Sequence, residues 1–261
     1  MSFRESFIEA DGFRVRYMEA GEGPPLIHLH GAGGLHLTPA HEMLSLHHRV
    51  IAFEMPGFGN SPENTRSAEM PDLASTMAAA VQALGIEVFD LLGSSFGGKV
   101  ALWLTALHPE RVRALVLEAP WAIRPADMQP ASGTAAEMAQ LLFAHPERMD
   151  PMPELDVAVG LKQRSLVGRL RGADRDQALE DRMRGLPTPV LVLFGTMDRV
   201  MPPEMGRVYK ALLPNCHLVF VYDAGHLIGA ERPEAFSEVV GDFLDRREAF
   251  VISRRETMIH P

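Results

Sequence analysis

The run Gly93-Ser94-Ser95-Phe96-Gly97 holds the residues best suited to chemistry. It follows five residues of strand character that begin at Val88, and an apolar helix pattern continues from it to Leu107. A chain that turns from strand to helix within one residue strains that residue, and glycines two positions to either side give it room. Such a turn exposes the Ser95 hydroxyl at a sheet edge, beside the unpaired amides of a helix N-terminus. The pattern predicts a nucleophile at Ser95, and Ser94 is a filler position because only Ser95 has glycine at both offsets.

A phosphate-binding loop is the alternative explanation of a glycine-rich turn between a strand and a helix. Such loops read G-x-G-x-x-G or G-x-x-x-x-G-K-[ST], and Lys99 here follows a glycine pair without that spacing. The sequence therefore favours the nucleophile over the phosphate site.

Two further residues could activate this serine. Asp198 follows the apolar run 190–194, and His226 follows the run 217–222. The carboxyl ends of parallel strands share one edge of a sheet, so these side chains are expected beside Ser95. A serine hydroxyl is a poor nucleophile near neutral pH, and it needs an imidazole to accept its proton and a carboxylate to orient that imidazole. The order along the chain predicts a triad of Ser95, Asp198 and His226, although Asp198 taken alone could equally cap the helix that follows it.

A glycine-rich loop, His30-Gly31-Ala32-Gly33-Gly34, comes directly after the apolar run 26–29. Backbone amides exposed in such a loop can stabilise the negative charge that develops on a carbonyl oxygen under attack. We expect the amides of Ala32 and Phe96 to form this oxyanion hole, with Gly33 as the second choice for the loop donor.

Strands and helices that alternate along most of the chain would position these residues. A hairpin is expected over 7–19 around Asp11-Gly12, where the two turn residues are typical of a tight connection. Further strands are predicted at 26–29, 49–53, 88–92, 112–117, 190–194 and 217–222, and helices near Pro39 and at 70–84, 96–107, 202–213 and 234–247. The alternation breaks over 121–187, which we interpret as an inserted helical lid. The expected fold is α/β, with a mostly parallel sheet of about eight strands and helices on both faces; 1–120 and 188–261 form the core domain.

These motifs resemble those of the α/β-hydrolase superfamily, in its lid-bearing branch of small-molecule esterases and carbon–carbon bond hydrolases. The resemblance covers 7–247 apart from the lid, and it is carried by 30–33, 56–61, 93–98, 195–198 and 225–226. It implies a serine hydrolase with the triad and oxyanion hole given above. Relatives carry Asp two residues before the Pro-Gly of the second loop, where this chain has Glu54, a position that is normally structural. Serine at position 95 argues against haloalkane dehalogenases and epoxide hydrolases, which use aspartate there.

Several other residues could belong to the site. Glu118 also ends a strand, and some members of the superfamily take their acid from that position; Asp198 is favoured because it occupies the commoner place. Trp121 is the expected substrate-binding residue. His28, His30 and the methionines of the lid are further pocket candidates, although methionine is more often adaptable core. Three lid arginines could meet an acidic substrate or form a solvated face: Arg164, Arg169 and Arg171.

Composition limits the remaining classes of function. A chain of 261 residues with a formal charge of −9 suits one large α/β domain and argues against a nucleic-acid partner, which needs clustered Lys and Arg. The single cysteine, Cys216, is expected to be buried, as in a reducing compartment. No signal-peptide pattern or uncharged membrane span is recognised, so a cytoplasmic protein is expected. No His, Cys and Asp cluster has metal-ligand spacing, and no cofactor is expected.

The combined expectation is a hydrolase that forms an acyl-enzyme at Ser95 from a small, partly apolar ester, thioester, lactone or amide. A carbon–carbon hydrolase that cleaves a diketone with the same triad is the nearest alternative. A ligand-binding receptor that keeps the fold and turns over negligibly is the alternative from another class. The sequence leaves the substrate and the oligomeric state open.

Overall fold

The computed structural model describes residues 2–126, 128, 131–152, 154–250 and 259–260. The tail beyond Glu248, to which the sequence assigns no role, lies mostly outside the described residues. One mixed sheet runs through the molecule, and its strands order as β1-β2-β4-β3-β5-β6-β7-β8-β9. The strands are β1 (Arg4–Ala10), β2 (Phe13–Ala20), β3 (Pro25–Leu29), β4 (Arg49–Glu54), β5 (Phe89–Ser94), β6 (Val112–Glu118), β7 (Val190–Gly195), β8 (Cys216–Val221) and β9 (Ile259–His260).

Six neighbouring strands, β4, β3, β5, β6, β7 and β8, are parallel. The hairpin of β1 and β2 adds to β4 in the antiparallel sense, and its two-residue turn at Asp11-Gly12 has the positive φ angles that such a turn requires. The predicted α/β class and mostly parallel sheet are confirmed. The two-residue β9, antiparallel to β8, is an addition that the sequence did not predict.

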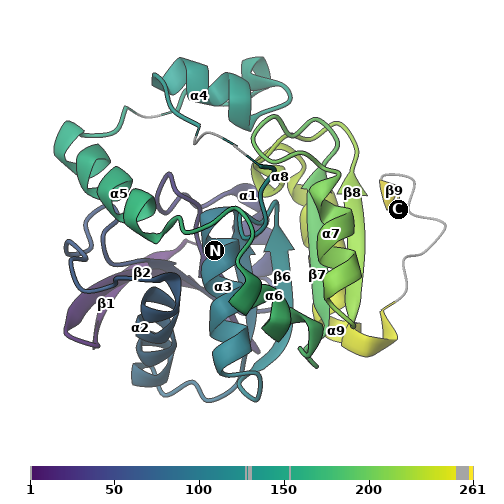
Figure 1. Cartoon of the computed structure of the whole chain (residues 1–261), viewed down its shortest axis with the longest axis horizontal. Helices are drawn as coiled ribbons and strands as arrows, with labels where there is room; N and C mark the ends of the chain where they lie inside the picture. The colour runs from purple at the N-terminus through teal and green to yellow at the C-terminus, as the bar shows by residue number, and fades with distance from the viewer. Residues whose placement is uncertain (1, 127, 129–130, 153, 251–258, 261) are drawn as a thin grey trace.

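Helices cover both faces of the sheet (Figure 1). The helices are α1 (Pro39–Leu44), α2 (Met70–Ala83), α3 (Phe96–Leu107), α4 (Ala135–Leu142), α5 (Val157–Leu170), α6 (Gln177–Arg184), α7 (Met205–Leu212), α8 (Ile228–Glu231) and α9 (Pro233–Arg246), with short 3₁₀ turns η1 (Pro146–Arg148) and η2 (Arg247–Ala249). Helices α2, α3, α6 and α7 lie on one face, while α1, α8 and α9 lie on the other. No helix among the described residues is both long and apolar enough to cross a membrane.

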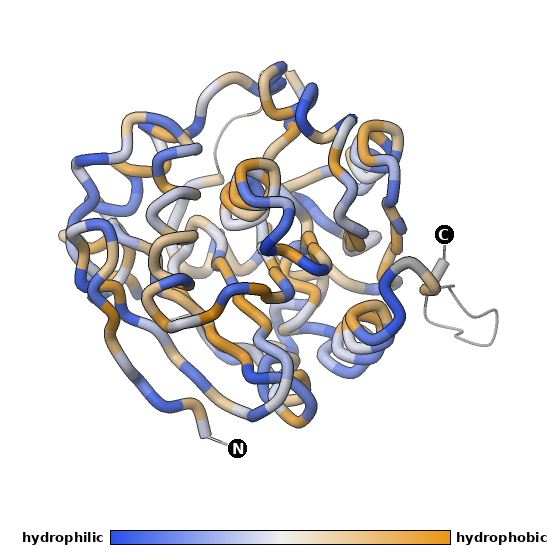
Figure 2. Tube along the Cα trace, turned by 90° about the horizontal axis from the view of Figure 1, so that it is seen from below, coloured by the Kyte–Doolittle hydropathy of each residue, from blue (hydrophilic) through white to orange (hydrophobic). Residues whose placement is uncertain are grey.

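Each face of the sheet buries its own apolar cluster. Met77, Val100 and Tyr209 represent the cluster under α2, α3 and α7, whereas Leu44 and Phe243 belong to the cluster under α1 and α9. Figure 2 shows the apolar residues concentrated on the central strands and the hydrophilic residues toward the outside. Every residue of β5 and β7 is buried, as expected for parallel strands covered on both faces. The strand ends that carry the candidate residues are therefore held rigidly.

The segment 121–187 between β6 and β7 contains α4, η1, α5 and α6. Helix α6 packs against α3 and α7 on the sheet face, while α4 and α5 lie above the edge of the sheet in Figure 1. Helix α4 buries none of its residues, whereas α5 buries Gly160, Gln163, Leu166 and Leu170. The division into a core and a lid at 121 and 187 stays a prediction.

One predicted boundary needs correction. Helix α7 begins at Met205 rather than near Pro202, because the carbonyls of Pro202 and Pro203 accept hydrogen bonds from Met205 and Gly206 in a preceding turn. The two prolines lack amide hydrogens and form this turn instead of the first helical residues.

Candidate active site

Ser95 sits at the turn between β5 and α3 with φ 51° and ψ −114°. This conformation is rare for a residue with a side chain and costs roughly 1–3 kcal/mol, which the surrounding packing must offset. A methyl group on Gly93 would lie 2.7 Å from the Ala101 Cβ, and one on Gly97 would lie 2.1 Å from the Leu29 carbonyl oxygen. Glycine at these two positions is therefore required for α3 to leave the sheet so sharply, as the sequence predicted.

Neighbouring strand ends fix the backbone of this turn. The Ser95 amide donates to the Glu118 carbonyl at 2.9 Å, and the Ser95 carbonyl accepts from the Trp121 amide at 2.9 Å. Gly31 lies opposite, where an added Cβ would be 3.4 Å from the Ser95 Cβ. The turn at Ser95 is thus clamped between the end of β6 and the loop after β3.

His226 and Asp198 come together beyond β8 and β7. The His226 Nδ1 lies 2.8 Å from the Asp198 Oδ2, and both side chains are buried. The other carboxylate oxygen of Asp198 accepts from the amides of Val200 and Met201, each at 2.8 Å. Asp198 therefore caps its own loop and contacts the imidazole. It does not cap the following helix, because α7 begins at Met205, and its role as the acid of the triad stays a prediction.

The loop after β3 presents the amides predicted as oxyanion donors. The Gly31 carbonyl accepts from the Gly34 amide at 3.1 Å and lies 2.7 Å from His30 Nδ1. Because this carbonyl is held from two sides, the Ala32 amide of the same peptide unit faces the opposite way. Phe96 is the first residue of α3, so its amide has no acceptor within the helix.

His30 anchors this loop through both of its ring nitrogens. Its Nε2 accepts from the Met55 amide at 3.1 Å, which assigns the proton to Nδ1 and makes Nδ1 the donor to Gly31. Burial lowers the pKa of His30 to about 4, so the ring is neutral and keeps this arrangement. A role of His30 in lining a pocket stays a prediction.

Glu118 and Ser94 bind each other at the end of β6 and β5. The Ser94 hydroxyl donates to the Glu118 Oε2 at 2.5 Å, and the Gly229 amide donates to the Glu118 Oε1 at 2.9 Å. His28 Nε2 lies 3.3 Å from the Ser94 Oγ. Ser94 is therefore more than a filler position, and His28 is one of its hydrogen-bonding partners. A role of His28 in a pocket stays a prediction.

This geometry agrees with comparisons with known proteins. A family model described as "alpha/beta hydrolase fold" matches residues 24–165. The chain is 32% identical over 266 residues to 2-hydroxymuconate semialdehyde hydrolase of Pseudomonas putida, covering 93% of this chain and 94% of the relative. The chain belongs to the alpha/beta hydrolase fold family.

Other relatives of this hydrolase carry different activities in their names. The pimeloyl-[acyl-carrier protein] methyl ester esterase of Neisseria meningitidis serogroup B is 31% identical, with 75% of this chain and 82% of the relative covered. Among solved structures, 2-hydroxy-6-oxo-6-phenylhexa-2,4-dienoate hydrolase from Rhodococcus sp. strain RHA1 superposes with a TM-score of 0.81 at 22% identity, covering 94% of this chain and 99% of that one. The fold is thus shared with hydrolases of different bonds.

Trp121 is buried next to the Ser95 turn of this hydrolase. Its ring packs 6.0 Å from the Phe96 ring centroid and carries the Arg124 guanidinium 4.4 Å above it. Arg124 is fully buried and paired with Asp174 at 3.0 Å. Beside them the Lys99 ammonium donates to the Arg171 carbonyl at 2.9 Å, and burial lowers the pKa of Lys99 to about 8. These contacts tie the segment after α5 to α3; a role of Trp121 in substrate binding stays a prediction.

Helix α5 of this hydrolase docks on two loops of the core. Gln163 donates from its Nε2 to the Gly33 carbonyl at 3.3 Å and accepts at its Oε1 from the Gly59 amide at 3.2 Å. Lys162 donates to the Gly59 and Ser61 carbonyls at 2.8 and 2.9 Å. One candidate arginine, Arg169, is used in the same way, on the carbonyls of Ser67 and Asn64. Arg171 likewise donates to the Met128 carbonyl.

Glu54, which stands where relatives carry Asp, closes the loop after β4 with its hydrogen bonds. Its Oε2 accepts from the amides of Asn60 and Ser61 at 2.7 and 2.9 Å, and its Oε1 accepts from Arg16 at 2.9 Å. The longer glutamate side chain closes the loop from its first residue, so the position is structural in this hydrolase.

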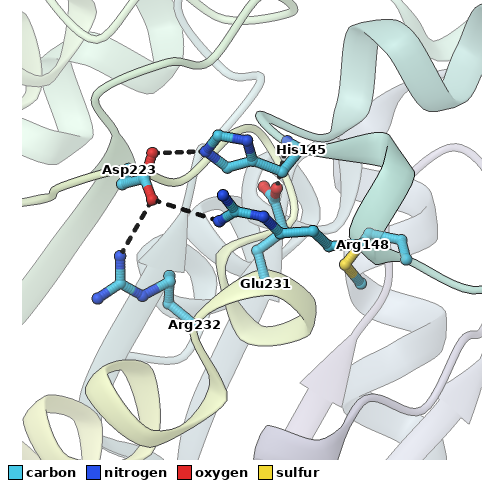
Figure 3. A pocket seen from close by; sticks show the side chains of 6 residues that line it. His145, Arg148, Asp223, Glu231 and Arg232 are labelled. Atoms are coloured by element: carbon cyan, nitrogen blue, oxygen red, sulfur yellow. Dashed lines mark hydrogen bonds and ion pairs between the residues drawn. The ribbon is translucent and has the colours of Figure 1, made fainter.

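A pocket of about 350 Å³ lies between the segment 145–149 and the residues that follow β8, and it does not include the predicted site residues (Figure 3). The Asp223 Oδ1 forms an ion pair with the His145 Nε2 at 2.6 Å. The Asp223 Oδ2 lies 3.8 Å from a guanidinium nitrogen of Arg148 and from one of Arg232. Glu231 lines the same pocket and accepts from the Gly225 and His145 amides. The backbone amide of His226 donates to the Leu142 carbonyl at 2.8 Å, so this charged cluster and the end of α4 support the loop that carries His226.

Sequence reasoning missed the residues whose partners are remote in the chain. Gln163 has no motif around it, and its contacts with Gly33 and Gly59 span more than a hundred positions. The His41 ring lies 3.0 Å from the His28 ring, measured between Nε2 and Nδ1, and no sequence motif connects the two residues. A local signal exists only for His41, which lies three residues after Thr38 at the start of α1.

Proposed function

We propose that this chain is a serine hydrolase in which Ser95 attacks a carbonyl group, His226 is the general base and Asp198 orients it. The substrate is a small, partly apolar ester, thioester, lactone or amide, and the reaction passes through an acyl-enzyme on Ser95. Two observations carry the proposal: the backbone of Ser95, after β5, is strained at φ 51°, and His226 and Asp198, after β8 and β7 of the same parallel sheet, form a buried pair. Strained backbone conformations of this kind cluster at active sites, where the strain helps to position the reacting group.

The bonding of Asp198 assigns the roles. Because a carboxylate oxygen of Asp198 accepts from the His226 Nδ1, that nitrogen carries the proton and Nε2 keeps its lone pair. Nε2 can then take the Ser95 proton during attack and return it to the leaving group. The Val200 and Met201 amides hold the carboxylate in the orientation that keeps the imidazole in this tautomer.

The amides of Ala32 and Phe96 would stabilise the oxyanion of the tetrahedral intermediate. The Phe96 amide belongs to the free N-terminus of α3, and the peptide unit before Ala32 is fixed by Gly34 and His30. Donors that need no rearrangement are worth most to the transition state, about 10²–10³ in rate for each. Gly33 remains the second choice for the loop donor.

Carbon–carbon bond hydrolysis of a diketone is the second candidate. The relative from Pseudomonas putida named 2-hydroxymuconate semialdehyde hydrolase, 32% identical over 93% of this chain, favours it. The same serine would attack a carbonyl, but the leaving group is a carbanion equivalent that must receive its proton at carbon. The two reactions therefore differ in the leaving group and share Ser95, Asp198 and His226.

Turnover of two substrate sets separates the candidates. One set is a series of p-nitrophenyl esters of increasing acyl length, and the other is 2-hydroxymuconate semialdehyde, followed by the loss of its absorbance. We expect turnover of at least one set by the wild type and its loss in Ser95→Ala. Faster turnover of the semialdehyde than of every ester would select carbon–carbon cleavage. Binding of these compounds without turnover would instead indicate a receptor.

A further inference from the structure

A continuous chain of hydrogen bonds runs beneath the candidate active site, from α1 to the end of β6. The Thr38 amide donates to the His41 Nδ1 at 3.0 Å, and the His41 Nε2 lies 3.0 Å from the His28 Nδ1. The His28 Nε2 lies 3.3 Å from the Ser94 Oγ, and the Ser94 hydroxyl lies 2.5 Å from the Glu118 Oε2. All of these side chains except Thr38 are buried.

The first donor sets the direction of every hydrogen in this chain. A backbone amide can only donate, so the His41 Nδ1 is an acceptor and the proton of a neutral His41 is on Nε2. Burial lowers the pKa of His41 to about 4 and that of His28 well below its ordinary value, so both rings are neutral. His41 therefore donates to the His28 Nδ1, His28 donates from Nε2 to Ser94, and Ser94 donates to Glu118. The chain delivers one oriented hydrogen bond to the carboxylate.

The carboxylate at the end of this chain joins two parts of the candidate site. Ser94 immediately precedes Ser95, and the Glu118 backbone carbonyl also accepts from the Ser95 amide at 2.9 Å. The other carboxylate oxygen accepts from the Gly229 amide at 2.9 Å, in the first turn of α8 and three residues after His226. Glu118 is buried, and Ser94 on β5 contacts it directly. His28 on β3 and His41 on α1 are linked to it through Ser94, and the charge of His226, after β8, acts on it.

We propose that Glu118 is a positioning residue that fixes the Ser95 turn relative to the His226 loop and supplies a second negative charge to His226. This inference rests on the proposed function, since it concerns the activation of Ser95 by His226. Glu118 acts from the side of β6, whereas Asp198 acts through direct contact with the ring. The chain from Thr38 to Ser94 keeps the carboxylate turned toward the site.

The surroundings of Glu118 favour this role. Burial raises the pKa of Glu118, and the hydrogen bonds from Ser94 and from the amides of Gly229 and Ile228 act against that rise. A positive charge on His226 would also favour the ionised form of Glu118. By reciprocity, the ionised carboxylate favours the imidazolium that forms when His226 accepts the Ser95 proton. In a buried site this attraction is stronger than in water.

The test is the rate at which a fluorophosphonate probe labels Ser95 in the full chain between pH 5 and 9. Glu118→Gln keeps the shape of the side chain and removes its charge. We expect labelling to slow about tenfold, the factor that 1.36 kcal/mol produces. We also expect the acidic limb of the rate profile to move to lower pH, because the general base is harder to protonate without the nearby charge. A merely structural contact would not move that limb.

Glu54→Gln is the matched control. Glu54 is also a buried glutamate at a strand end that accepts from two backbone amides, but its partners are Asn60, Ser61 and Arg16. We expect Glu54→Gln to leave the acidic limb where it is in the wild type. Wild-type rates and an unmoved limb in Glu118→Gln would overturn the inference, as would an equal shift of the limb in the control.

Ser94→Ala keeps the test decisive if Glu118→Gln does not fold, as judged by circular dichroism. It leaves the carboxylate in place and removes the donor at the end of the chain. We expect labelling about three- to tenfold slower, the effect of one lost hydrogen bond, and an unchanged rate would overturn the inference. If the wild type is not labelled at Ser95 at all, the proposed function fails; if it is labelled while both variants behave as the wild type, only the role of Glu118 fails.

Discussion

Two buried carboxylates follow or end neighbouring strands of the sheet, and they differ in what they bind. Asp198, beyond β7, bonds the His226 ring directly at 2.8 Å and the amides of its own loop. Glu118, at the end of β6, bonds Ser94 and the amide of Gly229. The sequence places both residues at the correct edge of the sheet. The difference between them lies in loop geometry, since the loop after β7 turns its carboxylate to the imidazole and the end of β6 turns its carboxylate under the Ser95 turn.

The same difference extends to the surroundings. Asp198 is held by backbone amides of adjacent residues, which is a local arrangement. Glu118 is held by a chain of side chains from α1, β3 and β5, which depends on the packed sheet. An acid positioned by its own loop is suited to direct contact with the base, and an acid positioned by the core is suited to fixing the elements around it.

The ranking of the two carboxylates gives the largest expected effect. Asp198→Asn removes the charge and permits the wrong tautomer of His226, so we expect a loss of about 10³–10⁴-fold in kcat. Glu118→Gln is expected to cost about tenfold. Steady-state kinetics on the best substrate of both variants makes the comparison. A greater loss in Glu118→Gln would make Glu118 the acid of the triad.

The stability of the fold should depend on pH because His30 and His41 are buried. Burial lowers the pKa of His30 and of His41 to about 4, while the unfolded chain titrates them near the ordinary value of about 6.5. Their contribution is present above about pH 6.5 and is lost as the pH falls toward 4, because the unfolded state binds protons first. At pH 5 we expect each of these two histidines to cost about 2 kcal/mol of unfolding free energy relative to pH 7. The raised pKa of Glu118 acts in the opposite sense, since its contribution is lost as the pH rises.

Urea unfolding at pH 7 and pH 5 checks this dependence. His41→Asn should reduce the difference between the two pH values by about 2 kcal/mol. Equal pH dependence in the wild type and in His41→Asn would show that His41 is protonated in the folded protein, and the direction assigned to the hydrogen-bond chain would then be wrong.

Helix α5 contacts the candidate site through Gln163, which binds neither of the two carboxylates. Gln163 bonds the Gly33 carbonyl in the loop that would supply an oxyanion donor, so Gln163→Leu should lower kcat about tenfold with a smaller change in KM. Lys162 docks the same helix on Gly59 and Ser61 without reaching that loop. We expect Lys162→Met to change kcat by less than about threefold. Equal losses of kcat in the two variants would mean that docking of α5 on the core matters and that the contact between Gln163 and Gly33 has no separate effect.

The elements of the core and the Ser95 turn could be predicted because their signals are local. Gly93 and Gly97, within five residues, indicate the close approach of α3 to the sheet. The fully apolar run at β7 indicates a strand that is buried on both faces. The hairpin at Asp11-Gly12 follows from two residues that accept positive φ. Each of these patterns has one dominant physical solution.

The support of the site could not be predicted, because it depends on contacts between distant segments. Ser94 looked like a filler position since its partners, His28 and Glu118, lie 66 and 24 positions away. The contact between Gln163 and Gly33 spans 130 positions. A sequence without an alignment gives no signal for such pairs, and only the folded sheet brings them together.

The assignment of Ser95 as the nucleophile is tested by the mass of the intact chain after reaction with a fluorophosphonate probe, followed by fragmentation of the peptide that contains Ser94 and Ser95. We expect one adduct per chain, on Ser95 and not on Ser94, and no adduct in Ser95→Ala. An adduct on another residue, or equal labelling of the wild type and Ser95→Ala, would contradict the assignment of Ser95 as the nucleophile.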